Sequence, residues 1–318
     1  MDKDERRLSD ALILGTALAA GALALAVNIP AVQEIFASRS RKKLAGLPDY
    51  PAYQKGQRVL MVSPHPDDET LATGAQISQA VRNGAEVYIA WMTNGDGFVL
   101  DSLIAERTDK PKGDLELGRT RMKEGQKAGA TLGVGSEHQR FLGFPDGSLK
   151  KVWEAGLQDG DKVVESSATH ATAVPYEGTL HPQQPYTANN FRQDITELLD
   201  DIKPDFVLLP AIHDMHPDHH ATNLFWTQVL RERGELKKAR YWLIHGGLEW
   251  PLPKGLLPHF PLLVSPRGKK MAWQQFEVQQ EDQLNKLQAV FAHETQVDML
   301  LNFMLSFCRA NELVALED

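Results

Sequence analysis

Two short stretches of the chain gather side chains that bind metal ions and transfer protons. The first is SPHPDDE, residues 63–69, and the second is HDMHPDHH, residues 213–220. Both contain His-Pro-Asp, and both combine imidazole nitrogens with carboxylate oxygens, which are ligands of zinc. One His and one carboxylate from the first stretch, together with one His from the second, would form a His-Asp-His site. Such a site leaves coordination positions open, which is typical of a catalytic rather than a structural metal.

The elements that must position these stretches are strands, because each stretch directly follows an apolar run. The runs are RVLMVS (58–63) and DFVLL (205–209), and helical patterns follow at 69–83 and 217–233. Further strands are predicted at 86–93, 140–142 and 240–245, and further helices at 117–132, 191–202, 281–291 and 296–310. This alternation predicts an α/β, Rossmann-like fold with a mostly parallel sheet and helices on both faces. Ligands of such sheets bind beyond the carboxyl ends of the strands, where both stretches lie.

A purely structural interpretation of the two stretches has to be weighed against the catalytic one. A single His-Pro-Asp is also typical of a turn in which an Asp caps a helix. The second occurrence of the motif, again after an apolar strand, favours the metal site. The stretch 147–190 lacks periodicity and is predicted to be a long loop region over the site.

The motifs resemble those of the PIG-L/LmbE family of zinc-dependent de-N-acetylases. The resemblance rests on HPDDE at 65–69 and on HPDH at 216–219. Two weaker signatures lie between them, RxxExxxA at 121–128 followed by LGV at 132–134, and FLGFPDG at 141–147. The resemblance spans roughly residues 57–300. It implies a Rossmann-like fold, a bound Zn²⁺ and removal of the acetyl group from an N-acetylglucosamine unit.

The resemblance also implies a role for each matching residue. The metal ligands would be His65, Asp68 and His219. Asp67 would be the general base, and His216 would steady the tetrahedral intermediate and protonate the leaving amine. The substrate-binding residues would be Arg121 and Asp146.

Several neighbouring residues have competing interpretations. Arg121 could be a solvated helix residue, and Asp146 could belong to a Pro-Asp-Gly turn. His213 and His220 are expected not to be ligands, because three protein ligands are usual at catalytic zinc. Asp218 is expected to orient a ligating histidine through a hydrogen bond.

The N-terminal region differs in composition from the rest of the chain. Residues 11–29 (ALILGTALAAGALALAVNI) carry no charge, and this run just reaches the ~20 residues that span a bilayer. We therefore expect a membrane anchor at 1–37, a linker at 38–56 and the catalytic domain at 57–318. A cleaved signal peptide and a buried soluble helix are the alternatives. Basic residues after the run favour a single-pass protein with a cytoplasmic catalytic domain.

Composition narrows the possible partners. The formal net charge is −8, which is unfavourable for binding nucleic acid, because phosphate neutralisation needs a basic surface. The expected substrate is an N-acetylated amino sugar, and the predicted anchor favours a lipid-linked sugar or a polysaccharide over a soluble conjugate. A metallohydrolase of another amide or an ester, with zinc or another divalent ion, is the alternative. A nucleotide-binding Rossmann protein would need a Gly-x-Gly-x-x-Gly turn after residues 58–63, where this chain has HPDD.

Overall fold

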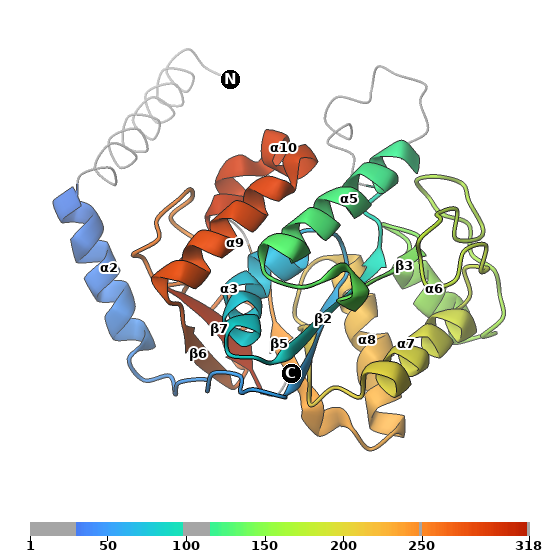
Figure 1. The fold of residues 1–318 in the computed structure, drawn as a ribbon, viewed down its shortest axis with the longest axis horizontal. Coiled ribbons are helices and arrows are strands. Elements are labelled where there is room, and N and C mark those ends of the chain that lie inside the picture. The colour runs from blue at the N-terminus through green and yellow to red at the C-terminus, as the bar shows by residue number, and fades with distance from the viewer. Residues whose placement is uncertain (1–29, 98–114, 248–249, 317–318) are drawn as a thin grey trace, which may run out of the picture.

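The computed structural model describes residues 30–97, 115–247 and 250–316 (Figure 1). These residues form one seven-stranded sheet in the order β3-β2-β1-β4-β5-β7-β6. The strands are β1 (Arg58–Ser63), β2 (Glu86–Thr93), β3 (Gln139–Phe144), β4 (Phe206–Pro210), β5 (Ala239–Trp242), β6 (Trp273–Glu277) and β7 (Asn311–Ala315). The five strands from β3 to β5 are parallel, whereas β7 pairs antiparallel with β5 and β6. The predicted mixed α/β fold with a mostly parallel sheet is confirmed.

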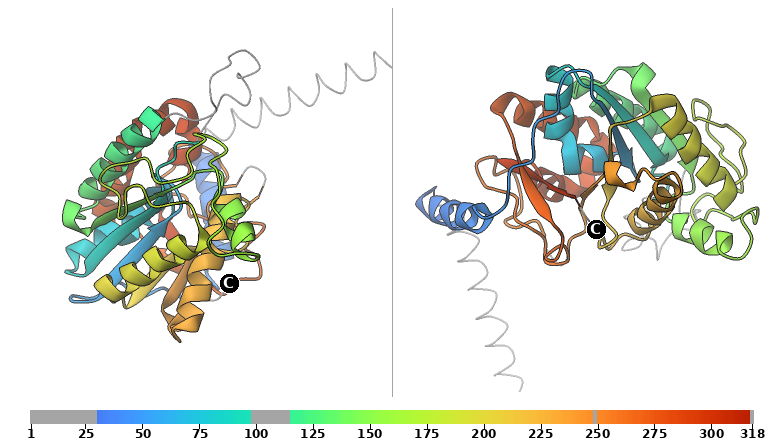
Figure 2. Two further views of the ribbon diagram at one scale, coloured as in Figure 1. Left: turned by 90° about the vertical axis from the view of Figure 1, so that its right-hand side faces the viewer. Right: turned by 90° about the horizontal axis from the view of Figure 1, so that it is seen from below.

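Helices cover both faces of the sheet. The described α-helices are α2 (Pro30–Leu44), α3 (Asp68–Arg82), α5 (Leu115–Thr131), α6 (Leu149–Gly156), α7 (Ala188–Ile202), α8 (Pro217–Glu232), α9 (Gln280–Ala292) and α10 (Glu294–Leu305). Helices α3, α5 and α9 pack together on one face, and α6, α7 and α8 pack together on the other (Figures 1 and 2). Strand β1 is therefore buried from Val59 to Ser63, which explains why its sequence is apolar without alternation.

The sheet topology brings the two chemically interesting stretches together. Strands β1 and β4 are parallel neighbours, with Met61 paired to Leu208, so both chains leave the sheet at the same edge. The helix after β1 covers one face and the helix after β4 covers the other (Figure 2). This is the reversal point of a doubly wound sheet, where a crevice forms beyond the carboxyl ends of the strands.

Two regions differ from the sequence-based expectation. The stretch 147–190, predicted as a loop, contains helix α6, which buries Leu149 and Val152. A helix of eight residues offers too few turns for its periodicity to be recognised within a long irregular region. The helix predicted at 296–310 ends at Leu305, and the chain then enters β7, which is buried throughout and forms the antiparallel edge with β6.

The prediction of a single-pass membrane anchor requires correction. Within residues 30–97, 115–247 and 250–316, no helix is long and apolar enough to cross a bilayer. The predicted segment, residues 11–29, lies outside the described residues. Helix α2 contains the boundary predicted between residues 37 and 38, and its last turn carries Arg41, Lys42 and Lys43. The accompanying prediction of membrane orientation falls with the anchor.

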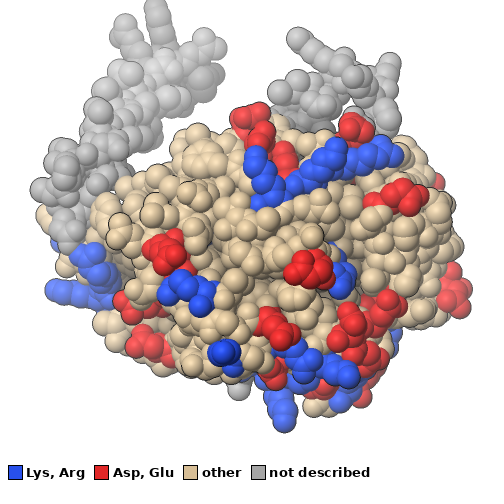
Figure 3. Space-filling model, viewed as in Figure 1, with Lys and Arg blue, Asp and Glu red and all other residues tan. Residues whose placement is uncertain are grey.

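Charges of both signs are distributed over the molecular surface. In the view of Figure 3, Lys and Arg side chains alternate with Asp and Glu side chains across a mostly uncharged surface. This face therefore lacks the continuous basic surface that nucleic-acid binding requires.

Candidate metal centre

The turn between β1 and α3 has a backbone conformation that few residues adopt. Asp67, the last residue before the helix, has φ 142° and ψ −31°, in a region that favours glycine. The turn is closed by its own carboxylates, because Asp68 Oδ2 accepts the His65 N–H at 2.9 Å and Glu69 Oε2 accepts the Asp67 N–H at 3.1 Å. An uncommon conformation fixed by several bonds is typical of functional sites.

Glu69 is the centre of a buried network beneath this turn. Its Oε2 also accepts hydrogen bonds from Trp91 Nε1 at 2.8 Å and from Ser63 Oγ at 3.0 Å. Its Oε1 accepts from Thr70 Oγ1 at 2.8 Å and lies 3.2 Å from His293 Nε2. Burial opposes ionisation, but the contacts with His293 and Trp91 lower the pKa of Glu69 overall. Glu69 is therefore an ionised brace that holds Asp67 in place.

The turn between β4 and α8 is an ordinary helix start. His216 has φ −74° and ψ 128°, and its Nδ1 caps the helix by accepting the Asp218 N–H at 3.3 Å. Pro217 occupies the first helical position, where its missing N–H has no cost. The buried Asp214 braces this turn, because Oδ1 accepts the His216 N–H at 2.9 Å and Oδ2 accepts the His245 N–H at 3.0 Å.

The two turns meet at the Asp68 carboxylate. Asp68 Oδ2 lies 3.0 Å from His65 Nδ1 and 3.1 Å from His219 Nε2. The three predicted metal ligands, from stretches about 150 residues apart in the chain, are thus adjacent. Burial opposes ionisation of Asp68, but His219 and His65 hold its pKa well below the usual range. The carboxylate is therefore negatively charged, which is the form in which a carboxyl group binds a metal ion.

Three overlapping groups of side chains could hold a metal ion among the described residues. In each group the candidate ligand atoms lie within 4.8 Å of one another. The groups are His65 with His216 and His219, Asp68 with His219 and His245, and His65 with Asp146 and Asp218. The predicted trio of His65, Asp68 and His219 is not itself one of these groups, although each of its members belongs to at least one. The rings of His216 and His219 lie 5.0 Å apart, and those of His219 and His245 lie 4.9 Å apart.

The surroundings of His219 fit a cation. The residue is fully buried, and neither ring nitrogen makes a hydrogen bond of good geometry with the described residues. Carboxylates nevertheless lie close to both nitrogens, Asp68 near Nε2 and Asp214 at 3.2 Å from Nδ1. Burial lowers the pKa of His219, but Asp214 and Asp68 outweigh it and raise the pKa to about 9. The position favours positive charge, and the imidazole and carboxylate donors suit Zn²⁺.

The predicted base, Asp67, lies against Arg121. Arg121 Nη2 donates to Asp67 Oδ2 at 3.2 Å and to Pro66 O at 2.7 Å, and Nη1 donates to Gly95 O at 3.0 Å. A Cβ atom at position 95 would lie 2.2 Å from Nη1, so glycine is required for this close approach. Burial raises the pKa of Asp67 to about 6, against the opposing charge of Arg121. The interpretation of Arg121 as a solvated residue is wrong, because the side chain is buried.

The other two predicted carboxylates face His65. Asp146 Oδ1 lies 3.1 Å from His65 Nε2, and Asp218 Oδ2 lies 3.4 Å from the same nitrogen. Asp218 also accepts the backbone N–H groups of Gly147 at 2.6 Å and Leu149 at 3.0 Å, which ties the second turn to the segment after β3. Asp218 thus contacts a predicted ligand, as the sequence suggested.

Asp214, His245 and His293 were not predicted from the sequence as parts of the site. The position of Asp214 inside the His-rich stretch 213–220 is the one available signal, because buried carboxylates often orient ligating histidines. His213, which was expected not to be a ligand, is exposed, and neither it nor His220 belongs to the metal-binding groups found among the described residues.

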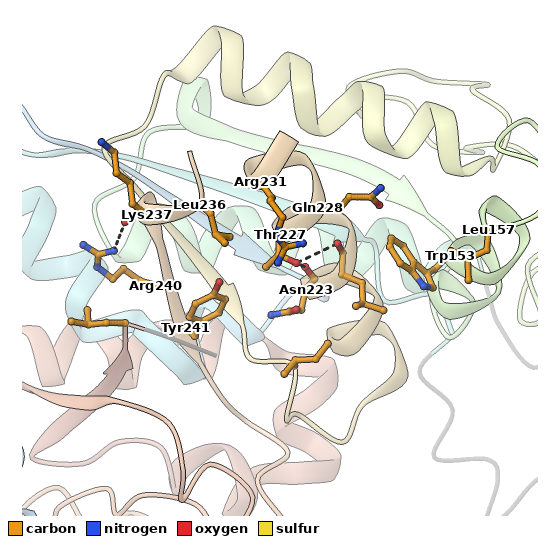
Figure 4. Close-up of a pocket in the computed structure, with 13 residues that line it drawn as sticks. Trp153, Leu157, Asn223, Thr227, Gln228, Arg231, Leu236, Lys237, Arg240 and Tyr241 are labelled. Atoms are coloured by element: carbon orange, nitrogen blue, oxygen red, sulfur yellow. Dashed lines mark hydrogen bonds between the residues drawn. The ribbon is translucent and has the colours of Figure 1, made fainter. Parts of the chain in front are cut away.

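A pocket of about 280 Å³ lies at the candidate site. Its wall includes His65, Asp67, Asp68, Arg121, Asp146, His216 and His245. A larger hollow of about 1000 Å³ is lined in part by residues of α8, among them Asn223 and Thr227 (Figure 4). Its described lining residues, which include Trp153, Arg231 and Tyr241, contain no His, Asp or Glu. The smaller pocket therefore has the groups for metal-dependent chemistry, and the larger one does not.

Comparison with known proteins places this site in context. The family model described as "PIG-L: GlcNAc-PI de-N-acetylase" matches residues 60–230. A 1D-myo-inositol 2-acetamido-2-deoxy-alpha-D-glucopyranoside deacetylase of Mycobacterium sp. (strain KMS) is 31% identical over 196 residues, which are 59% of this chain and 54% of the relative. A protein of the same name from Thermobifida fusca is 39% identical over 88 residues, 27% of this chain and 29% of the relative. The chain thus spans about half, or less, of the length of these curated relatives.

Solved structures support the fold. The A40926 pseudoaglycone deacetylase has a TM-score of 0.53 at 22% identity, with 81% of this chain and 96% of that chain covered. A deacetylase of teicoplanin biosynthesis has a TM-score of 0.52 at 20% identity, with 81% and 97% covered. Because the family model matches more than half of the 318 residues and includes both His-Pro-Asp turns, the chain belongs to the PIG-L family.

Proposed function

We propose that the chain is a zinc-dependent hydrolase that removes the acetyl group from an N-acetylglucosamine-containing substrate and releases acetate. The observation that carries the proposal is the convergence of His65 and His219 on Asp68, with Asp67 lining the same pocket. Relatives named as deacetylases of an N-acetylglucosamine conjugate support the choice of substrate class. The argument for a lipid-linked sugar rested on the predicted membrane anchor and falls with it.

The proposed metal ligands are His65, Asp68 and His219. A zinc ion held there would polarise the acetamide carbonyl and lower the pKa of a bound water molecule. Asp214 would orient His219, and Asp218 and Asp146 would orient His65, through the contacts described above.

Asp67 is the proposed general base. Its Oδ2 is engaged by Arg121, which leaves Oδ1 to accept a proton from the attacking water. With a pKa of about 6, the carboxylate is ionised at neutral pH and is still basic enough to take that proton. Once protonated, Asp67 can deliver the proton to the amine nitrogen as the C–N bond breaks.

His216 is the proposed stabiliser of the oxyanion. Its Nδ1 accepts a backbone hydrogen bond, so the proton of the neutral ring resides on Nε2. Burial, reinforced by the neighbouring His65 and His219, lowers the pKa of His216 to about 2 and keeps the ring neutral. Nε2–H can therefore donate to the carbonyl oxygen as negative charge develops there. This geometry favours Asp67 over His216 as the source of the leaving-group proton.

The structure disfavours the nucleotide-binding alternative. A dinucleotide pyrophosphate would sit at the N-terminus of α3, where backbone N–H groups normally bind it. Here Asp67 and Asp68 occupy that position, and the carboxylate of Asp68 is ionised. Two carboxyl groups at this point would repel a phosphate.

A substrate panel tests the proposal. The protein is stripped with a chelator, reloaded with Zn²⁺ and incubated with N-acetylglucosamine glycosides, N-acylated amino acids and acetyl esters, while released acetate is measured. We expect zinc-dependent acetate release from the N-acetylglucosamine glycosides. Faster hydrolysis of the esters or of the other amides would favour a different metallohydrolase. Full activity after stripping would contradict the metal centre.

A further inference from the structure

A second hollow adjoins the candidate metal centre. Its volume is about 400 Å³, and three of its lining residues, His216, His245 and Phe303, also line the metal-binding pocket. The remaining lining residues are Met215, Pro217, Gly247, Trp250 and Lys254. We refer to the surface formed by Met215, Trp250 and Phe303 as the apolar shelf. A substrate whose acetamide reaches the metal centre would extend directly onto it.

The apolar shelf offers little hydrogen bonding to a ligand. The indole N–H of Trp250 is already engaged, since Nε1 donates to Leu263 O at 2.9 Å. Phe303 presents an aromatic ring, and it stacks against His245 with an interplanar angle of 15° and 6.2 Å between ring centroids. Met215 is 54% exposed, and a flexible thioether of this kind adapts to apolar and aromatic ligands.

Lys254, one of the described lining residues of this hollow, is cationic. Lys254 Nζ is 4.9 Å from the centroid of the Phe303 ring, a cation–π arrangement that holds the aromatic ring in position. Phe303 is further packed against Phe307, with ring centroids 5.3 Å apart. The Phe303 ring of the shelf is therefore held in position beside the candidate metal centre.

We propose that the apolar shelf binds the aglycone of the substrate, and that this aglycone is aromatic or otherwise apolar. The inference rests on the proposed deacetylase function. The acetamide of N-acetylglucosamine is on C2, and the aglycone is attached to the adjacent C1, so the two must occupy neighbouring subsites. A polyhydroxylated aglycone such as inositol would lose hydrogen bonds to water on this surface without replacing them. An aryl group would gain from removal of its apolar area from water.

Matched glycosides test this proposal. The zinc-loaded protein is assayed with the methyl, phenyl and inositol glycosides of N-acetylglucosamine. We expect kcat/KM for the phenyl glycoside to exceed those for the methyl and inositol glycosides roughly tenfold, as burial of part of a ring predicts. Equal values for all three, with acetate released from each, would overturn the apolar shelf while leaving the deacetylase function intact.

Two variants test whether the apolar shelf causes the preference for the phenyl glycoside. Met215→Ser should lower kcat/KM for the phenyl glycoside several-fold more than for the inositol glycoside. Leu284→Ser, on α9, is the control, because Leu284 is similarly exposed at 51% but does not line the hollow. It should leave the preference unchanged. An undiminished preference in Met215→Ser and in Phe303→Leu would exclude the shelf as its source.

A binding measurement separates the two proposals if no glycoside is hydrolysed. Calorimetric titration of the zinc-loaded protein with the same three glycosides then reports the subsite directly. Tighter binding of the phenyl glycoside, weakened in Met215→Ser, would support the shelf although the deacetylase function had failed. Binding without preference, or no binding, would overturn the shelf.

Discussion

The two turns of the candidate site share a motif but differ in backbone. Both follow parallel strands, both contain His-Pro-Asp, and each leads into a helix. At the second turn, His216 caps α8 from an ordinary extended conformation. At the first, Asp67 precedes α3 with φ 142° and makes no capping hydrogen bond through its side chain. The first turn thus gives up a helix cap and leaves its carboxylate available for the pocket.

Each turn has its own buried carboxylate brace, and the braces work differently. Asp214 accepts mainly backbone N–H groups and also faces the ring of His219. Glu69 accepts from the Asp67 N–H and from side chains such as Trp91, and none of its contacts is to a proposed metal ligand. We therefore expect Asp214 to orient His219, a proposed metal ligand, and Glu69 to orient Asp67, the proposed base.

The largest expected effect separates two adjacent residues of the first turn. Asp67→Asn should lower kcat by roughly 10²–10⁴-fold, as loss of a general base does, with zinc retained. Asp68→Ala should lose the metal, because Asp68 is the carboxylate shared by His65 and His219. Turnover assays and elemental analysis of dialysed protein measure the two properties. Equal metal loss in both variants would refute this division of roles.

The two braces supply the next prediction. Asp214→Asn should weaken zinc binding by roughly 10–100-fold, since removal of a carboxylate that orients a ligating histidine has effects of this size. Glu69→Gln is the matched control, because it also neutralises one buried brace. It should lower kcat while changing zinc affinity less than Asp214→Asn does. Competition with a chelator of known affinity measures both, and equal losses of affinity would remove the distinction between the turns.

The dependence of kcat/KM on pH at acidic pH, its acid limb, tests the proposed role of Asp67. As the proposed general base, the Asp67 carboxylate would act in its ionised form, and burial raises its pKa to about 6. We therefore expect kcat/KM to be constant above that pH and to fall tenfold per pH unit below it. Arg121 lowers the pKa of Asp67, so Arg121→Gln should move the limb to higher pH. Profiles of the two proteins, loaded with the same metal, test this, and an unmoved limb would mean that another group controls it.

Much of the fold follows from local patterns in the sequence. The apolar runs before both turns correspond to β1 and β4, and the helical patterns after them correspond to α3 and α8. The antiparallel edge was not predicted from the sequence. Strands β6 and β7 are short, and although they pair with each other they lie far apart in the sequence. Strand β7 follows α10 after residues 306–310, which had been predicted as part of the helix.

In the site, too, some features follow from local sequence patterns and others depend on the fold. The two His-Pro-Asp motifs predict His65, Asp67, Asp68, His216 and His219 as candidate site residues, and the structure brings these residues close together. Asp214 and Glu69 lie within or next to those motifs, but their roles depend on contacts with His245 and Trp91 from other strands and loops. Arg121 was expected to contact substrate, whereas its contacts with Asp67 and Pro66 appear only after α5 packs against the turn. The local motifs thus indicate the candidate ligands, whereas the contacts that support them depend on the fold.

The smallest expected effect concerns the backbone of the first turn. Asp67→Gly and Asp67→Ala both remove the carboxylate, but only glycine adopts φ 142° without strain. The glycine variant should have the higher free energy of unfolding, by about 1–2 kcal/mol. Urea unfolding in the presence of a chelator measures this difference without a contribution from bound metal.

The second turn provides the control for this comparison. His220 lies within α8, where helical backbone favours alanine over glycine by about 1 kcal/mol. His220→Ala should therefore be more stable than His220→Gly, the reverse of the order at Asp67. If alanine were the more stable residue at both positions, the conformation of Asp67 would be unstrained. The uncommon backbone could then no longer be regarded as the cost of presenting the base to the pocket.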